Sequence, residues 1–154
     1  MNSTSAILPI VMRYVHIVSA VLAVGGLAFL SLCLSPAMRM LDESFRESVA
    51  KLVQHRFYRI LWVSLGGLVV SGVYNWIASS QTYKAMGPAG NALIGTKVLL
   101  ALVMFAIVWA GSIGKMKPKA WHTAAVHLAA IVMLLAVILR HFRLEYLQSL
   151  ASGG

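Results

Sequence analysis

Long apolar runs separated by short polar stretches dominate the sequence. Four runs reach the roughly 20 residues that a helix needs to cross a bilayer. They cover about residues 14–35, 58–79, 92–114 and 121–141. The connections are a polar stretch at 37–57, a Gly/Pro turn at 87–90 and a short basic loop at 115–119. Short connections favour antiparallel neighbours. The pattern therefore predicts an all-α integral membrane protein, a four-helix up-down bundle in which residues 1–154 form a single transmembrane domain.

The residues that flank the four runs lead to three further predictions about where the helices begin and end. Apolar residues recur at helical spacing among the charges of residues 41–54, which predicts an interfacial helix or an extension of the second span. Pro36 is expected to end the first helix. The fourth helix is expected to continue past the bilayer, from Glu145 to Leu150.

Composition agrees with a membrane protein. The chain is 60% hydrophobic and only 11% charged, with a mean hydropathy of +0.82, whereas a soluble domain keeps about 25% charged residues. This excludes a soluble enzyme, a secreted disulfide scaffold and a disordered tail. The net charge of +9 resides mostly in loops, where anionic lipid headgroups rather than nucleic acid are the expected partner. Cys33 lies in an apolar run and is expected to be a core thiol.

The distribution of basic residues predicts the orientation. No Lys or Arg precedes Arg13, so the first run lacks the basic region of a signal peptide and is expected to stay in the mature protein. One side carries Arg39, Arg46, Lys51, Arg56, Arg59 and the three lysines of 115–119, and the other carries Arg13, Lys84, Arg140 and Arg143. The positive-inside rule then places both termini outside in a multi-pass protein of the bacterial cytoplasmic (inner) membrane.

Five histidines are the main candidates for function, because ionisable groups inside a membrane are costly. His127 and His141 are 14 residues apart, a rotation about 40° short of four full turns and about 21 Å along the axis. They therefore share one face of the last span. That separation suits two haem groups stacked across a bilayer, each held by imidazoles from two helices.

The predicted topology also offers a second ligand at each level. His16 lies level with His141, and His55 approaches the level of His127, with His122 as a competing inner ligand. The hypothesis is one or two b-type haems, six-coordinate, that exchange electrons with a quinone or small redox partner. The alternative is that each histidine is an interfacial anchor or a hydrogen-bonded core residue.

Other residues fit a cofactor without requiring one. Lys97 lies within the third span and would either snorkel to the outer interface or pair with a haem propionate or bound anion near His16. Arg59 and Arg140 would pair with propionates or with lipid phosphates. Glycines in the first two spans would admit a flat macrocycle or let helices pack closely; they are Gly25, Gly26, Gly66, Gly67 and Gly72.

Three other classes of protein fit the sequence to different degrees. All four acidic residues lie outside the spans or at their edges, which disfavours a proton-driven transporter. Met38 and Met40 form a Met-x-Met pair, and copper often uses such thioethers. A copper permease or chaperone that uses His16, Met38 and Met40 therefore stays open. A structural role as an accessory subunit is also open, because a 154-residue bundle has little extramembrane surface for catalysis. The chain could act as a homo-oligomer or as a subunit of a larger complex.

Short motifs in the first three spans resemble those of small bacterial membrane proteins of the CopD-like and HemJ-like type. The matching segments are Arg13–His16, Gly25–Leu30, Arg56–Arg59, Ser71–Asn75 and Gly95–Val98. The resemblance implies a bundle of four or more helices that performs either haem-linked oxidation of a porphyrinogen or copper handling, with His16 and Lys97 as the functional pair. The last helix departs from the HemJ type. Its histidine spacing instead resembles bis-histidine cytochromes of the b561 kind.

Overall fold

The computed structural model describes residues 3–113, 115 and 118–152. Within these residues the chain forms α1 (Ser3–Phe29), a π-helical turn η1 (Leu30–Leu34), α2 (Ser35–Met38), α3 (Glu43–Ala85), α4 (Gly87–Ser112) and α5 (Pro118–Ser152). Four described helical segments are long and apolar enough to cross a membrane: Ile7–Met38, Glu43–Ala85, Gly90–Ser112 and Ala120–Ser152. The expected all-α, four-helix membrane fold is confirmed.

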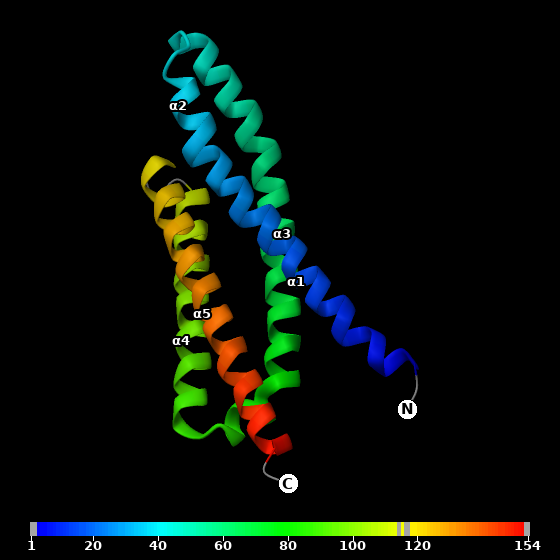
Figure 1. Cartoon of the computed structure of the whole chain (residues 1–154). Helices are drawn as coiled ribbons and strands as arrows, with labels where there is room; N and C mark the ends of the chain where they lie inside the picture. The colour runs from blue at the N-terminus through cyan, green and yellow to red at the C-terminus, as the bar shows by residue number, and fades with distance from the viewer. Residues whose placement is uncertain (1–2, 114, 116–117, 153–154) are drawn as a thin grey trace.

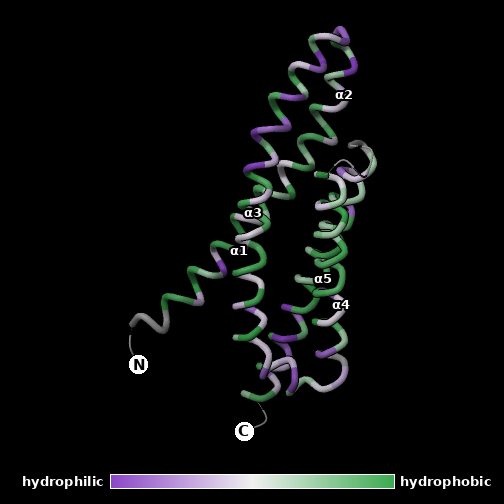
Figure 2. The backbone as a smooth tube through the Cα atoms, turned by 180° about the vertical axis from the view of Figure 1, so that it is seen from behind, coloured by the Kyte–Doolittle hydropathy of each residue, from purple (hydrophilic) through white to green (hydrophobic). Residues whose placement is uncertain are grey.

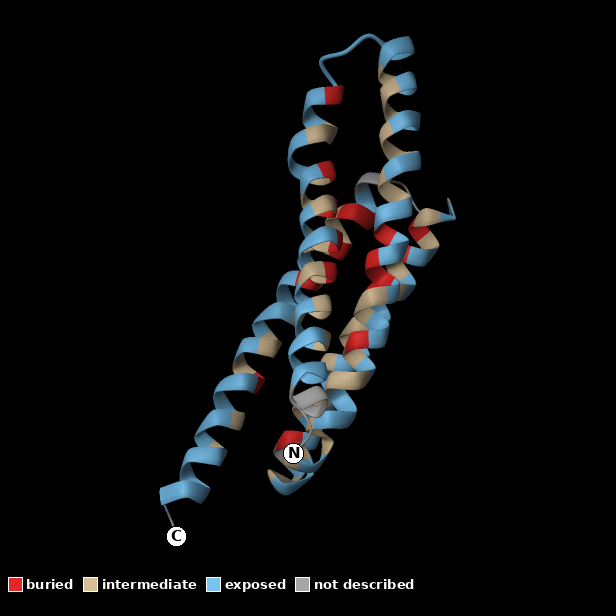
Figure 3. Ribbon diagram, turned by 90° about the vertical axis from the view of Figure 1, so that its right-hand side faces the viewer, coloured by how far each residue is buried: buried red, intermediate tan, exposed pale blue. Residues whose placement is uncertain are grey.

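The helices form two antiparallel pairs (Figure 1). α1 packs mainly on α3, and α4 packs mainly on α5. The N-terminal half of α1 diverges from α5 in both Figure 1 and Figure 3, whereas the two helices approach each other nearer the π turn. The bundle is therefore closed at one end and more open at the other.

The buried core lies where the two pairs meet. It consists of Ala23, Leu27, Leu61, Leu65, Val108, Trp121 and Ala125, and the buried positions gather at this level in Figure 3. Small residues allow the close approach, because a Cβ at Gly67 would collide with the Ser19 hydroxyl and one at Gly111 with the Trp121 ring. Small residues at helix interfaces commonly serve this purpose in membranes.

The sequence predicted that the first helix ends at Pro36, but the structure shows that it does not. The helix continues to Met38, with the π turn placed just before the proline. Proline has no N–H, and its ring clashes with the carbonyl four residues back, here that of Leu32. In the π turn the Ser35 N–H donates to the Leu30 carbonyl, five residues back. The wider turn accommodates the proline without breaking the helix.

α3 is much longer than a membrane span. Its 43 residues extend about 65 Å, compared with a hydrocarbon core of about 30 Å. Residues 43–54 continue the helix without a break, so the extension of the second span is the alternative that the structure adopts. Together with α2 it forms a hairpin that projects beyond α4 and α5, and Figure 2 shows hydrophilic positions along it.

The remaining connections differ in detail from expectation. The predicted 87–90 turn is tighter, since α4 already begins at Gly87, whose φ of 75° is left-handed and suits a glycine after a helix end. The last helix extends to Ser152, beyond the expected Leu150. Within the predicted basic loop, residues 116–117 lie outside the described residues, as does residue 114 at the end of the third predicted span.

Candidate functional site

His16 lies at the interface between α1 and α3. Its half-buried ring faces α3, where Nδ1 lies 2.9 Å from the hydroxyl oxygen of the fully buried Ser71. Gly72 borders the same ring, since a Cβ built there would lie 3.6 Å from His16 Cε1. The side chain is therefore oriented by a polar contact on one edge and by a glycine beside it.

The hydrogen bonds of Ser71 determine which nitrogen of His16 carries the proton. The Ser71 hydroxyl has one proton, and it donates that proton to the Gly67 carbonyl at 2.5 Å. Its oxygen is then an acceptor toward His16, so Nδ1 is the protonated nitrogen. A neutral imidazole with Nδ1–H leaves a lone pair on Nε2. This is the tautomer of a histidine that ligates a metal through Nε2.

Lys97 lies in the same region of the bundle. It is half-buried on α4, within electrostatic range of the His16 ring. The helices α1, α3 and α4 thus carry an imidazole, a hydroxyl and an ammonium group in one region of the bundle. The two residues that the family resemblance pairs, His16 and Lys97, are within electrostatic range of each other.

The other three predicted haem ligands are exposed on the bundle. His55 is exposed on α3, and on α5 the exposed His127 donates from Nδ1 to the Thr123 carbonyl at 2.8 Å. The His141 side chain is 70% exposed, with Nε2 3.2 Å from a Glu145 carboxylate oxygen. Among the hydrogen bonds and ring contacts of the described residues, none joins His16 to His141 or His55 to His127.

His127 shares one property with His16. Its Nδ1 faces a carbonyl oxygen, which can only accept, so Nδ1 carries the proton and Nε2 keeps its lone pair. His141 has the opposite arrangement, because its Nε2 faces the Glu145 carboxylate. In the described chain His16 and His127 therefore have Nε2 available to a ligand, one from inside the bundle and one from the lipid-facing surface.

His122 is buried at the start of α5, with 7% of its surface exposed. Its ring meets Trp121 edge-on, with ring centroids 4.0 Å apart. The buried Nε2 has no hydrogen-bond partner in the described part of the chain. His122 also lines a pocket at the end of the bundle that carries the projecting hairpin.

The arginines and glycines that could contact a cofactor differ in their exposure and in their neighbours. Arg59 and Arg140 are exposed. Gly26 and Gly67 face the Phe57 and Ser19 side chains of neighbouring helices, so these two glycines serve helix packing. Gly25 and Gly66 face open space, and Gly72 alone of the five borders a candidate ligand.

The metal donors of the described residues are dispersed. No group of three or more His, Cys, Asp or Glu side chains gathers in that part of the chain. Cys33, expected in the core, is exposed, because its side of the π turn faces outward. Met38 is buried and Met40 is 89% exposed, and both lie about 33 Å or more along the helix from His16. A single copper ion cannot contact all three.

The sequence did not single out Ser71 or the pocket beside His122. A serine inside an apolar span was the available signal for Ser71, but its partner on another helix depends on the packing of α1 on α3. Comparison with family models, curated proteins and solved structures finds no match to this chain. The family likeness stays a resemblance of short motifs.

Proposed function

We propose that the chain is a membrane-bound b-type haem protein that passes electrons between a quinone or small oxidant and a partner, with His16 as an axial ligand. The observation that carries the proposal is the state of His16, whose Nδ1 is held by Ser71 and whose Nε2 keeps a lone pair. Histidines that bind iron through Nε2 need this second contact to fix the ring and its tautomer.

The neighbouring residues fit the same role. The haem, when bound, supplies a one-electron Fe(III)/Fe(II) couple. His16 would hold the iron, Ser71 would fix the orientation of the imidazole, and Lys97 would pair with a propionate. His127, whose Nε2 is also unprotonated, is the best second ligand where two haems or a second copy of the chain are involved. The proposed location is the bacterial cytoplasmic membrane, with both termini outside.

The direct test is a dithionite-reduced minus air-oxidised spectrum of detergent-purified protein, with pyridine haemochrome quantification per chain. Expression is supplied with a haem precursor. The wild type is expected to show a sharp α-band with one or two haems b. His16→Gln is expected to lose the haem whose ligand it removes, while the same change at His127 or His141 identifies a second ligand. Haem-free wild type, or unchanged haem content in His16→Gln, contradicts the proposal.

Oxidation of a porphyrinogen is a second candidate, favoured by the approach of Lys97 to His16. The ammonium group would bind a carboxylate of the substrate next to the redox centre. Complementation of a strain that lacks this activity separates the two functions. Lys97→Met is expected to retain haem and abolish complementation if the chain is such an oxidase. Failure of the wild type to complement leaves electron transfer as the function.

A further inference from the structure

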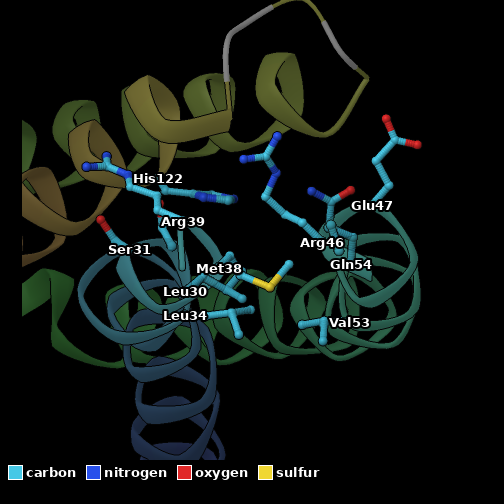
Figure 4. A pocket seen from close by; sticks show the side chains of 12 residues that line it. Leu30, Ser31, Leu34, Met38, Arg39, Arg46, Glu47, Val53, Gln54 and His122 are labelled. Atoms are coloured by element: carbon cyan, nitrogen blue, oxygen red, sulfur yellow. The ribbon is translucent and has the colours of Figure 1, made fainter. Parts of the chain in front are cut away.

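A pocket of about 440 Å³ lies between the π turn, the projecting part of α3 and the start of α5 (Figure 4). It lies beyond the C-terminal end of α1, since Leu30, the lining residue nearest to His16 in sequence, is 14 positions away, about 21 Å along the helix axis. One wall is apolar, formed by Leu30, Leu34, Met38 and Val53. The pocket thus has an apolar wall next to the charged residues of the projecting hairpin.

The polar side of the pocket is positively charged. Arg39 and Arg46 line it, and among the described residues no carboxylate pairs with Arg39. Arg46 binds Glu43 at 3.1 Å, which leaves the rest of its guanidinium available. Glu47 also lines the pocket, but its carboxylate points away from His122 in Figure 4 and lies 3.8 Å from the Lys51 ammonium. Arg39 is therefore the lining cation that no carboxylate of the described residues neutralises, next to an Arg46 that is shared with Glu43.

His122 adds a polar group that has no partner. Figure 4 shows its ring extending into the pocket between the two arginines. The ring is 7% exposed, and its Nε2 makes no hydrogen bond within the described chain. Buried polar groups are almost always hydrogen-bonded, so an unpaired one favours a bound partner such as a ligand or water. Because Nε2 itself is closed to solvent, a small rotation of the ring would bring it to an oxygen atom of an anion in the pocket.

The π turn forms part of this site. Leu30, Ser31 and Leu34, three of its five residues, line the pocket. Ser31 is also tied to α5 through a contact of 3.3 Å with the Thr123 hydroxyl, one residue after His122. π turns inside α-helices are frequent at functional sites. Here the wide turn presents an apolar wall directly beside a buried histidine.

We propose that this pocket binds the phosphate of an anionic phospholipid. Arg39, Arg46 and His122 surround the phosphate, and the acyl chain lies along the apolar wall of Leu30, Leu34, Met38 and Val53. Basic pockets between membrane helices on the cytoplasmic side are known to take anionic headgroups. The two sides of the pocket match the two parts of such a lipid, and the site does not depend on haem.

Native mass spectrometry of the detergent-purified full chain tests this, with phosphatidylglycerol and phosphatidylcholine of the same acyl chains added in equal amounts. The wild type is expected to retain one phosphatidylglycerol in preference to phosphatidylcholine. Arg39→Gln and His122→Gln are each expected to weaken retention by about tenfold, the effect of losing one hydrogen bond to a charged group. Arg56→Gln is the matched control, since Arg56 is exposed on the same segment outside the pocket.

Three results overturn the proposal. The first is equal retention by Arg39→Gln, His122→Gln and Arg56→Gln, provided that circular dichroism shows all three folded. The second is complete displacement of the lipid by inorganic phosphate at millimolar concentration, which would make the site one for a free anion. The third is occupation by a short-chain quinone in place of phosphatidylglycerol. Retention of lipid by Leu34→Asp at the wild-type level would likewise exclude the assigned place of the acyl chain.

Discussion

Replacing Ser71 with alanine removes the one hydroxyl that links His16 to α3. In the wild type the Ser71 oxygen accepts from His16 Nδ1 at 2.9 Å and donates to its own helix at the Gly67 carbonyl. The second bond is of little consequence for the fold, because it stays within one helix. Loss of the first removes the side-chain partner of His16 Nδ1 and leaves the Leu68 backbone as the remaining polar contact of the ring on α3.

The expected effects follow from these two contacts. Hydrogen bonds between membrane helices contribute on average about 0.6 kcal/mol, with a maximum near 1.7 kcal/mol. Because Ser71 is fully buried, we expect a loss of about 1–1.7 kcal/mol in the free energy of unfolding. Loss of the partner that orients a metal-binding histidine lowers metal affinity by about 10- to 100-fold. Haem affinity should fall by a similar factor.

Three measurements separate these effects. Unfolding in mixed micelles gives the free energy, and haem titration of the apoprotein gives the affinity. Nitrogen-15 chemical shifts of the His16 ring report the tautomer directly, with Nδ1 protonated and Nε2 unprotonated in the neutral wild type. Ser80→Ala is the matched control, because within the described residues the Ser80 hydroxyl bonds to the Ile77 carbonyl of its own helix, at 2.8 Å, and to no other helix.

The reasoning is refuted if Ser71→Ala behaves like Ser80→Ala in both stability and haem affinity. It is also refuted if the nitrogen-15 spectrum of the neutral ring shows the proton on His16 Nε2. In that case the lone pair would lie on Nδ1, next to Ser71, and His16 could not ligate iron through its free edge.

Two other substitutions test the packing of the helices. Gly67→Ala should destabilise the protein by about 1–3 kcal/mol, the usual cost of overpacking, because the added methyl group would meet Ser19. Gly66→Ala is the control and should be near neutral, because Gly66 faces open space. Equal unfolding midpoints for the two variants would contradict this expectation. Arg143→Ala removes a 3.2 Å hydrogen bond from α5 to Ser79 on α3. We expect the free energy of unfolding to fall by about 0.6 kcal/mol. Thermal unfolding that matches the wild type would show that this hydrogen bond does not stabilise the protein.

The four-helix membrane fold was predictable because each span is encoded locally, in a run of apolar residues as long as a bilayer is thick. The ends of the helices were harder to predict from the sequence. Pro36 usually ends a helix, but the π turn before it compensates for the missing N–H, and such a turn depends on the packing of α1 against α3 and α5. Cys33 was misplaced for the same reason, since the turn determines which side of the helix faces outward.

The candidate site was predictable in part. The depth of His16 and Lys97 along their spans follows from counting residues, and the structure brings the two side chains within electrostatic range. Counting residues does not show how each helix is rotated about its axis, and therefore which side chains point into the bundle. His127 and His141 share one face by arithmetic, but only packing could reveal that this face is exposed in the single chain. Ser71 and the pocket at His122 also depend on contacts between helices.

The π turn determines on which side of the first helix the residues after it lie. A turn that closes five residues back instead of four contains one surplus residue, and one residue of an α-helix corresponds to a rotation of about 100°. Deletion of one residue within Leu30–Leu34, combined with Pro36→Ala, would therefore restore a regular helix and keep Met38 and Arg39 on their present side. Straightening the turn at constant length, as Pro36→Ala would favour, would instead rotate both away from the pocket. The phase between the two halves of the helix is thus set by a single residue.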